Sequence, residues 1–183
     1  METKETYKGE TKMENGKITL REIGTKNLEA VLDLKPTEEQ KNFVASNMFS
    51  LAEAYAVNAS GRYAKPLAIY ADDEPVGFMM IGYDFKNDYD EEEDDEELPY
   101  FVEKSYLFWR FMIDKEHQGN GYGRKALALA LDFIRSFPAG EAEYCWLSYE
   151  PENEVARKLY ASFGFEEKEL PEGWDEIPAL LKL

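Results

Sequence analysis

The spacing of apolar and polar residues predicts short strands that alternate with amphipathic helices. Apolar and polar side chains alternate from Ile18 to Ile23, which is the pattern of a strand with one buried face. A strongly apolar run predicts a strand over residues 106–113, and further strands are expected over residues 66–71, 76–83, 143–149, 165–170 and 177–183. Helical spacing predicts helices over residues 26–34, over a longer stretch that ends before Gly61, over residues 124–137, and after Asn153.

The ends of these helices carry recognisable capping residues. Thr25 is a candidate N-cap for the first helix, and Asn153 is a candidate for the last. Thr37 followed by Gln40 has the spelling of a capping box, so we expect the longer helix to begin there. Gly164 suits the position just beyond the last helix, where a left-handed residue commonly ends the helix.

Nothing in the pattern divides the chain, because it contains no internal repeat and no interdomain linker. At 183 residues with 44% hydrophobic content, the chain suits one globular domain with a substantial core. We predict this domain over residues 17–183, preceded by a flexible leader over residues 1–16.

Several absences favour a cytoplasmic protein that does not associate with membranes. No apolar run approaches the roughly 20 residues that span a bilayer, and residues 1–16 lack the apolar stretch of a signal peptide. The single cysteine, Cys145, excludes an intrachain disulfide framework. Because His117 is the only histidine, we also expect no metal site.

The net charge of the chain indicates which kinds of partner it can bind. The formal net charge is -17, and nine of the ten residues from Asp88 to Glu97 are acidic. A surface of this sign argues against nucleic acid and favours a cationic ligand or partner. We expect the run in the long tip of an antiparallel hairpin formed by the strands over residues 76–83 and 106–113. The alternative is a solvated acidic loop with no specific role.

A glycine-rich turn, Gln118-Gly119-Asn120-Gly121-Tyr122-Gly123, lies between a predicted strand and a predicted helix. This arrangement presents free backbone N–H groups to an anion. The turn is not a Walker A loop, because it lacks the Gly-Lys-Ser/Thr ending. It is not a dinucleotide fingerprint either, because Arg124 stands where that motif needs glycine or alanine.

A second motif, Asn153-x-x-Ala156-x-x-Leu159-Tyr160-x-x-x-Gly164-Phe165, occupies the last predicted helix. The two motifs, in this order and at this spacing, resemble conserved blocks of the GNAT family of N-acetyltransferases. Residues 43–55, 76–78 and 109–114 look like the bacterial diamine, spermine and spermidine acetyltransferases, so the resemblance covers residues 18–183. The acidic run is longer than that branch leads us to expect, which leaves the preferred amine open.

The resemblance implies an α/β fold with a mixed, largely antiparallel, twisted sheet and helices on both faces. It also implies acetyl transfer from acetyl-CoA, the co-substrate, to a primary amine, with a polyamine or diamine as the first candidate. One alternative is an acetyltransferase for a protein, peptide or other amine. The others are a catalytically silent CoA-binding module and an acidic interaction protein whose run Asp88–Glu97 docks a basic partner. The sequence leaves a homodimer open.

The resemblance also implies the residues that hold acetyl-CoA. The last strand residues before the turn would pair with the pantetheine amides through their backbone, and the turn would bind the pyrophosphate. Asn153 matches a residue that contacts the pantetheine arm, although its role could be helix capping alone. The expected cofactor-site residues are Phe111, Met112, Ile113, Gln118, Gly119, Gly121, Tyr122, Gly123, Arg124, Asn153, Ala156 and Lys158.

Tyr160 matches the family's general acid, which protonates the departing CoA sulfur. The alternative is a core tyrosine on an amphipathic helix. The general base stays open between Glu53, Glu150, Asp114 and a chain of water molecules. We expect His117 to be exposed and not catalytic.

Recognition of a polycation needs carboxylates and aromatic faces. The expected acceptor-site residues lie on segments that border the acceptor cleft in this family, and they are Glu53, Tyr55, Tyr83, Asp84, Trp109, Tyr149 and Glu150. As a set, they favour an amine over an acidic acceptor.

Overall fold

The computed structural model describes residues 16–85, 99–170 and 173–183, and within them the strands form a seven-stranded sheet. The strand order is β1-β2-β3-β4-β5-β7-β6, and every neighbouring pair is antiparallel except β4 and β5. The strands are β1 (Ile18–Glu22), β2 (Tyr63–Ala71), β3 (Glu74–Tyr83), β4 (Tyr106–Ile113), β5 (Tyr144–Tyr149), β6 (Glu166–Glu167) and β7 (Ile177–Lys182).

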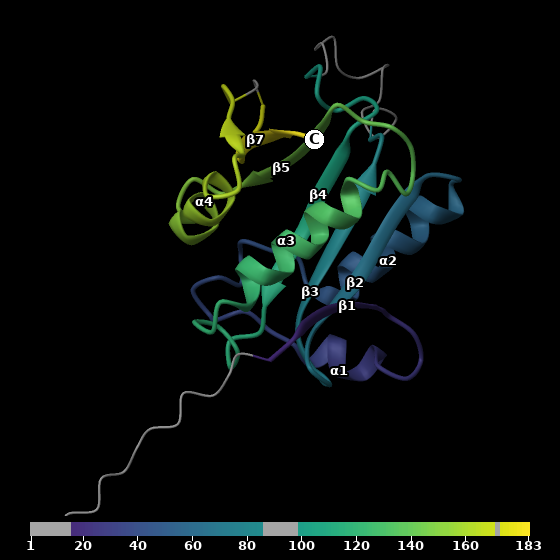
Figure 1. The fold of residues 1–183 in the computed structure, drawn as a ribbon, viewed down its shortest axis with the longest axis vertical. Coiled ribbons are helices and arrows are strands. Elements are labelled where there is room, and N and C mark those ends of the chain that lie inside the picture. Colours follow the sequence, from purple (N-terminus) through teal and green to yellow (C-terminus); the bar gives the residue numbers. More distant parts are fainter. Residues whose placement is uncertain (1–15, 86–98, 171–172) are drawn as a thin grey trace, which may run out of the picture.

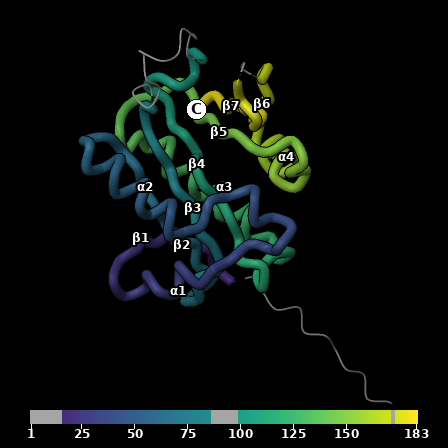
Figure 2. The backbone as a smooth tube through the Cα atoms, turned by 180° about the vertical axis from the view of Figure 1, so that it is seen from behind, coloured from purple at the N-terminus to yellow at the C-terminus, as the bar shows by residue number. Residues whose placement is uncertain are grey.

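Helices cover both faces of the sheet (Figures 1 and 2). On one face lie α1 (Leu28–Asp33) and α2 (Asn47–Ala59), and on the other lie α3 (Tyr122–Ile134) and α4 (Glu154–Ala161). Successive side chains of β2 point to opposite faces of the sheet, so this strand contributes to both layers. Leu67 and Ile69 pack in the hydrophobic cluster under α3, whereas Ala68 and Tyr70 pack in the cluster under α1 and α2. The predicted α/β fold with a largely antiparallel sheet is therefore confirmed.

Three local predictions about element ends are wrong. The longer helix begins at Asn47 with Ser46 as its N-cap, whose Oγ accepts from the N–H of Phe49 at 3.2 Å. The Thr37–Gln40 spelling instead forms turns, because the side chain of Gln40 bonds to Gln118. The first helix has Asn27 rather than Thr25 at its N-cap position, and no side chain caps it. The strand predicted over residues 165–170 shrinks to the exposed pair Glu166–Glu167 at the sheet edge.

The hairpin predicted around the acidic run is present, because β3 and β4 are antiparallel neighbours. The run itself, Asp88 to Glu97, and nearly all of the predicted leader lie outside the described residues. None of the helices in the described part of the chain is long and apolar enough to cross a membrane.

The parallel pair β4–β5 is very short. Only Tyr106 and Leu107 of β4 pair with β5, opposite Cys145 and Trp146. A bulge at Trp109 then bends β4, since Met80 of β3 faces Arg110 whereas the next residue, Ile81, faces Phe108. Beyond the bulge no described strand pairs with the β5-facing edge of β4, which leaves backbone groups of Phe111 to Ile113 without a ladder partner.

Candidate active site

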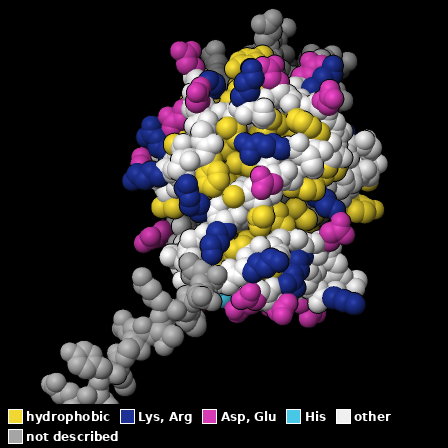
Figure 3. Space-filling model, viewed as in Figure 1, with side chains coloured by type: hydrophobic (Ala, Val, Ile, Leu, Met, Phe, Trp, Pro, Cys, Tyr) yellow, Lys and Arg dark blue, Asp and Glu magenta, His cyan; other side chains and the backbone are white. Residues whose placement is uncertain are grey.

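A cavity of about 840 Å³ lies where β4 and β5 separate. Its wall is formed by β4 and β5, the turns between α1 and α2, the loop before α3, the inner side of α4, and residues 173–176. This volume falls within the roughly 300–1,000 Å³ of typical ligand sites. Figure 3 shows apolar side chains exposed among scattered charges on the α3 and α4 face of the molecule.

The glycine-rich turn forms the end of the cavity at the N-terminus of α3. Gly121 is the N-cap residue with φ 73°, and Gly119 has φ 81°, a conformation that residues with a Cβ rarely adopt. No side chain caps the helix, so the N–H groups of its first turn remain available to an anion.

Two side chains fix this turn in place. The Nε2 group of Gln118 donates to the carbonyl of Ile113 at 2.9 Å and to Oε1 of Gln40 at 2.7 Å. The guanidinium of Arg124 donates to Oγ of Ser162 at 2.7 Å and lies 4.9 Å from the centre of the Phe163 ring. The turn is thereby tied to β4, to the α1–α2 connection and to the end of α4, and its positive side chain is held at the cavity wall.

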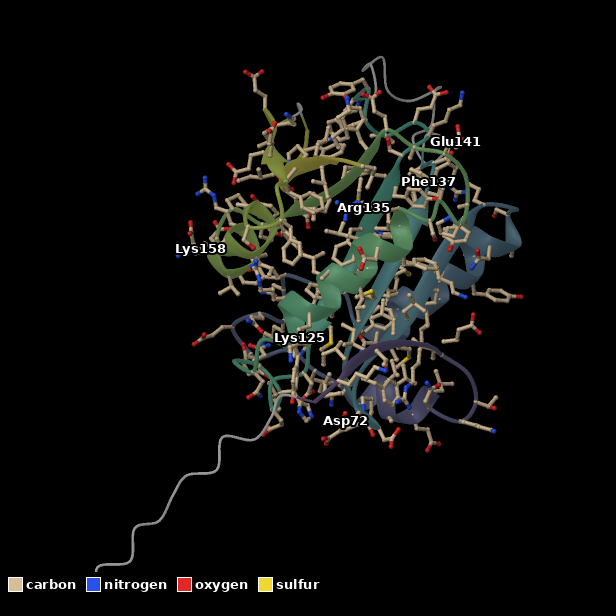
Figure 4. The ribbon with its side chains drawn as sticks, viewed as in Figure 1. Asp72, Lys125, Arg135, Phe137, Glu141 and Lys158 are labelled. Carbon is tan, nitrogen blue, oxygen red and sulfur yellow. The ribbon has the colours of Figure 1, made fainter. Side chains whose placement is uncertain are left out.

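The α4 wall begins with its cap. Oδ1 of Asn153 accepts from the N–H of Ala156 at 3.1 Å, which confirms the predicted N-cap. Both residues line the cavity. Lys158 does not, because it projects from the outer side of α4 (Figure 4) and its Nζ lies 3.7 Å from a carboxylate oxygen of Glu154. All the other expected cofactor-site residues stand in the cavity wall.

Tyr160 lies on the cavity side of α4 and is 8% exposed. Its ring centre is 5.8 Å from those of Tyr149 and Phe165, and 6.3 Å from that of Phe108. Burial, assisted by nearby Cys145 and Tyr149, raises the pKa of Tyr160 above its ordinary value. Its hydroxyl has no hydrogen-bond partner among the described residues, and the raised pKa keeps it neutral and able to donate.

Of the residues expected to bind the acceptor, only Trp109 and Tyr149 line the cavity. The ring centres of Tyr83 and Tyr106 lie 4.9 Å apart at a tilted angle, and the Tyr83 hydroxyl donates to the carbonyl of Glu141 at 3.0 Å, on the α3 side of the sheet. Asp84 accepts from the N–H of Lys104 at 3.1 Å, and Tyr55 projects from α2 with 77% exposure.

Glu53 also lies outside the cavity wall, because its carboxylate forms an ion pair with Arg110 at 3.1 Å. The guanidinium of Arg110, which does line the cavity, lies 5.0 Å from the centre of the Trp109 ring, and its Nε is buried without a partner. Glu53 therefore neutralises a cation of the wall instead of presenting a free carboxylate to the cavity.

The carboxylates considered as the general base are likewise outside the cavity wall. Asp114 is buried, and its oxygens accept from the N–H groups of Lys35 at 2.8 Å and Glu116 at 2.9 Å, so it joins two loops. Glu150 is the residue directly after β5, and it is not among the residues that line the cavity. The prediction that His117 is exposed is wrong, because its side chain is only 23% exposed and lines the cavity. Its Nε2 lies 3.7 Å from Oε1 of Glu74.

The cavity wall also contains residues that the sequence reasoning missed. Phe85, Trp146 and Trp174 add aromatic surface, and Asp175 and Glu176 add carboxylates just before β7. Ser148 of β5 donates a short hydrogen bond to Glu176. The available signal was the sequence Trp174-Asp175-Glu176, which places an aromatic residue and two carboxylates directly before the final predicted strand.

Comparison with known proteins supports this picture. Residues 28–165 match the acetyltransferase (GNAT) family model. A probable spermine N(1)-acetyltransferase of Bacillus subtilis subsp. natto is 29% identical over 151 residues, which is 81% of this chain and 88% of that protein. A spermine/spermidine N(1)-acetyltransferase of Bacillus subtilis is 28% identical over 151 residues, again 81% of this chain and 88% of that protein.

Solved structures share the fold. An aminoglycoside acetyltransferase in complex with coenzyme A has a TM-score of 0.66 at 16% identity, over 91% of this chain and 95% of that one. A spermidine N-acetyltransferase from Vibrio cholerae, in complex with coenzyme A and spermine, has a TM-score of 0.60 at 19% identity. The match covers 89% of this chain and 92% of that one. The resemblance read from the two sequence motifs is confirmed. Because the family model spans well over half of the chain, this protein belongs to the acetyltransferase (GNAT) family.

Proposed function

We propose that this protein transfers the acetyl group of acetyl-CoA to a primary amine of a polyamine or diamine, in the cytoplasm. The observation that carries the proposal is that one cavity joins an uncapped helix N-terminus to an aromatic and acidic end. The cationic acceptors of the Bacillus subtilis relatives agree with this distribution of charge.

The residues of one half of the cavity fit acetyl-CoA. The first-turn N–H groups of α3 suit its pyrophosphate, and Arg124 adds a positive charge at the same place. The unpaired edge of β4 from Phe111 to Ile113 supplies backbone groups for the amides of the pantetheine arm. The thioester supplies an activated acetyl carbon when acetyl-CoA is bound.

The chain's own part in the reaction is to move protons. A bond forms between the amine nitrogen and the acetyl carbon while the carbon–sulfur bond breaks, and the Tyr160 hydroxyl gives its proton to the sulfur. An ammonium substrate loses two protons in all. One is released when the neutral nucleophile forms, and the other restores the Tyr160 hydroxyl. The raised pKa keeps that hydroxyl protonated at neutral pH.

The test is a turnover assay with purified protein and acetyl-CoA against a panel of amines. We expect release of CoA thiol and an acetylated product with spermidine, spermine and 1,4-diaminobutane, and less with a peptide or an aminoglycoside. Preference for the peptide or the aminoglycoside would refute the acceptor assignment. Acetyl-CoA binding without turnover of any amine would instead indicate a catalytically silent binding module.

A further inference from the structure

We infer that Asp175 and Glu176 bind the second, unreacted ammonium group of a diamine or polyamine, an inference that rests on the proposed function. Both carboxylates stand in the cavity wall directly before β7. They lie on a segment that neither sequence motif includes. Together with Glu150 we call them the acidic cluster.

The sheet register brings the acidic cluster together. The β5–β7 ladder ends at the pair Tyr149 and Ile177, so the next position on each strand is Glu150 and Glu176. Burial raises the pKa of Glu150, and the nearby charges of Glu176, Glu152 and Asp175 add to the rise. Like charges at facing positions weaken a sheet, so packing alone does not explain this arrangement.

No Lys or Arg of the described chain forms an ion pair with any member of the acidic cluster. By contrast, Glu167 on the neighbouring edge strand is paired with Arg157 at 2.7 Å, and Glu53 is paired with Arg110 at 3.1 Å. The one strong contact of Glu176 is the hydrogen bond that it accepts from Ser148, which orients its carboxylate. Within the described residues, the acidic cluster therefore has no Lys or Arg partner, and its member Glu176 is oriented by Ser148.

An aromatic surface adjoins the acidic cluster. Trp146 precedes Ser148 by two positions on β5, so both side chains lie on the same face of that strand. The rings of Trp146 and Trp174 lie 5.9 Å apart, and that of Trp109 lies 4.8 Å from Phe85. Aromatic faces attract ammonium groups, most strongly where water is excluded.

Trp146 gives an independent indication that a ligand belongs here. This residue is 4% exposed and lines the cavity, yet its indole N–H is buried without a hydrogen-bond partner in the described structure. Buried donors are nearly always satisfied in native proteins. Only a hydrogen-bond acceptor can satisfy this N–H, such as a carbonyl or a neutral amine nitrogen, so the donor indicates a polar ligand in the cavity rather than the ammonium group itself.

The two ends of the cavity differ in charge, which orients an elongated amine. The Arg124 end favours an anion, and the Asp175–Glu176 end favours a cation. A diamine with one ammonium at the acidic end therefore directs its other amine toward Tyr160 and the middle of the cavity. A monoamine lacks this second contact.

The experiment compares 1,4-diaminobutane with n-butylamine, which has the same carbon chain and one amine. For Asp175→Asn and Glu176→Gln, we expect the ratio of kcat/KM for the diamine to that for the monoamine to fall about 10- to 100-fold, as for loss of a hydrogen bond to a charged group. Ser148→Ala should lower the same ratio by less. Glu152→Gln is the control, because it removes an equal charge near the cluster but outside the cavity wall.

Equal losses for both amines in Asp175→Asn and Glu176→Gln would overturn the inference. A loss that Glu152→Gln reproduces and that high salt abolishes would also overturn it, because that result indicates long-range attraction only. Calorimetric binding of 1,4-diaminobutane separates this inference from the proposed function. Binding that the two variants weaken, without acetylation by the wild type, would retain the inference and refute the enzyme. If the wild type acetylates the diamine and the two variants bind it as tightly as the wild type does, the proposed function is retained and the inference is refuted.

Discussion

Replacing Tyr160 with phenylalanine tests the catalytic assignment with little change to the fold. The ring keeps its contacts with Phe108, Tyr149 and Phe165, and the lost hydroxyl has no hydrogen-bond partner among the described residues. We therefore expect the free energy of unfolding to change by less than about 1 kcal/mol. Urea unfolding of both proteins measures this change.

The effect on turnover should be much larger. A general acid contributes about 10²–10⁴-fold, which corresponds to roughly 3–5 kcal/mol of transition-state stabilisation. The kcat of Tyr160→Phe, measured from release of CoA thiol at saturating substrates, should fall by a factor in that range while acetyl-CoA affinity stays nearly the same. A decrease of less than about threefold, far below the contribution of a general acid, would show that Tyr160 only packs.

Tyr106→Phe provides a control with the opposite signature. The hydroxyl of Tyr106 donates to the carbonyl of Gly140 at 2.9 Å and accepts from the N–H of Ala139 at 3.0 Å, and it lies outside the cavity wall. Its loss leaves partly buried backbone groups without partners, so we expect a stability loss of about 1–3 kcal/mol. The kcat should remain close to that of the wild type.

The pH dependence gives a further check on Tyr160. Because burial raises its pKa in the folded protein, the unfolded chain loses this proton first as the pH rises. The contribution of Tyr160 to stability is thus complete below the unfolded pKa of about 10 and is lost as the pH rises through the higher folded pKa. The unfolding free energy of Tyr160→Phe should fall less steeply above about pH 10 than that of the wild type. An identical slope would contradict the buried, neutral hydroxyl.

Three further predictions concern the residues around the site. Gly121→Asp should weaken acetyl-CoA binding by at least about tenfold in calorimetry, because it adds a negative charge at the helix N-terminus. Gly121→Ala adds only backbone strain and should weaken binding less. Equal effects of the two substitutions would contradict the anion site. Glu53→Gln should cost about 1.5–3 kcal/mol in urea unfolding, because Arg110 loses its charged partner, and a cost below about 0.5 kcal/mol would show a weak pair. Ser46→Ala should cost about 1 kcal/mol as a lost N-cap, whereas an equal cost for Thr37→Ala would contradict the observed helix start.

The sequence predicted the fold well because the signals for its elements are local. Two-residue alternation marks β1, a short apolar run marks β4, and helical spacing marks α3 and α4. The glycine-rich turn could be placed at a helix start because Gly119 and Gly121 need a positive φ that few other residues adopt. Asn153 was identified as a cap because capping depends on residues within one turn.

Several of the failures come from contacts between residues far apart in sequence. The Thr37–Gln40 spelling is a plausible local cap, but Gln40 bonds to Gln118, 78 positions away. Glu53 looked like a free carboxylate, but it pairs with Arg110 across 57 positions. Asp175 and Glu176 join the site only because of the β5–β7 register, which no local pattern determines.

The short parallel pair explains why the site lies where it does. Parallel neighbours need a crossover, and here α3 supplies it, so its N-terminus follows directly from the end of β4. The bulge at Trp109 bends β4 after only two residues have paired with β5, which separates the strands beside that helix end. The separation exposes one edge of β4 and also the Trp146–Ser148 face of β5. One irregularity in the sheet thus brings an uncapped helix N-terminus, an unpaired backbone edge and the carboxylates of Asp175 and Glu176 to the same cavity.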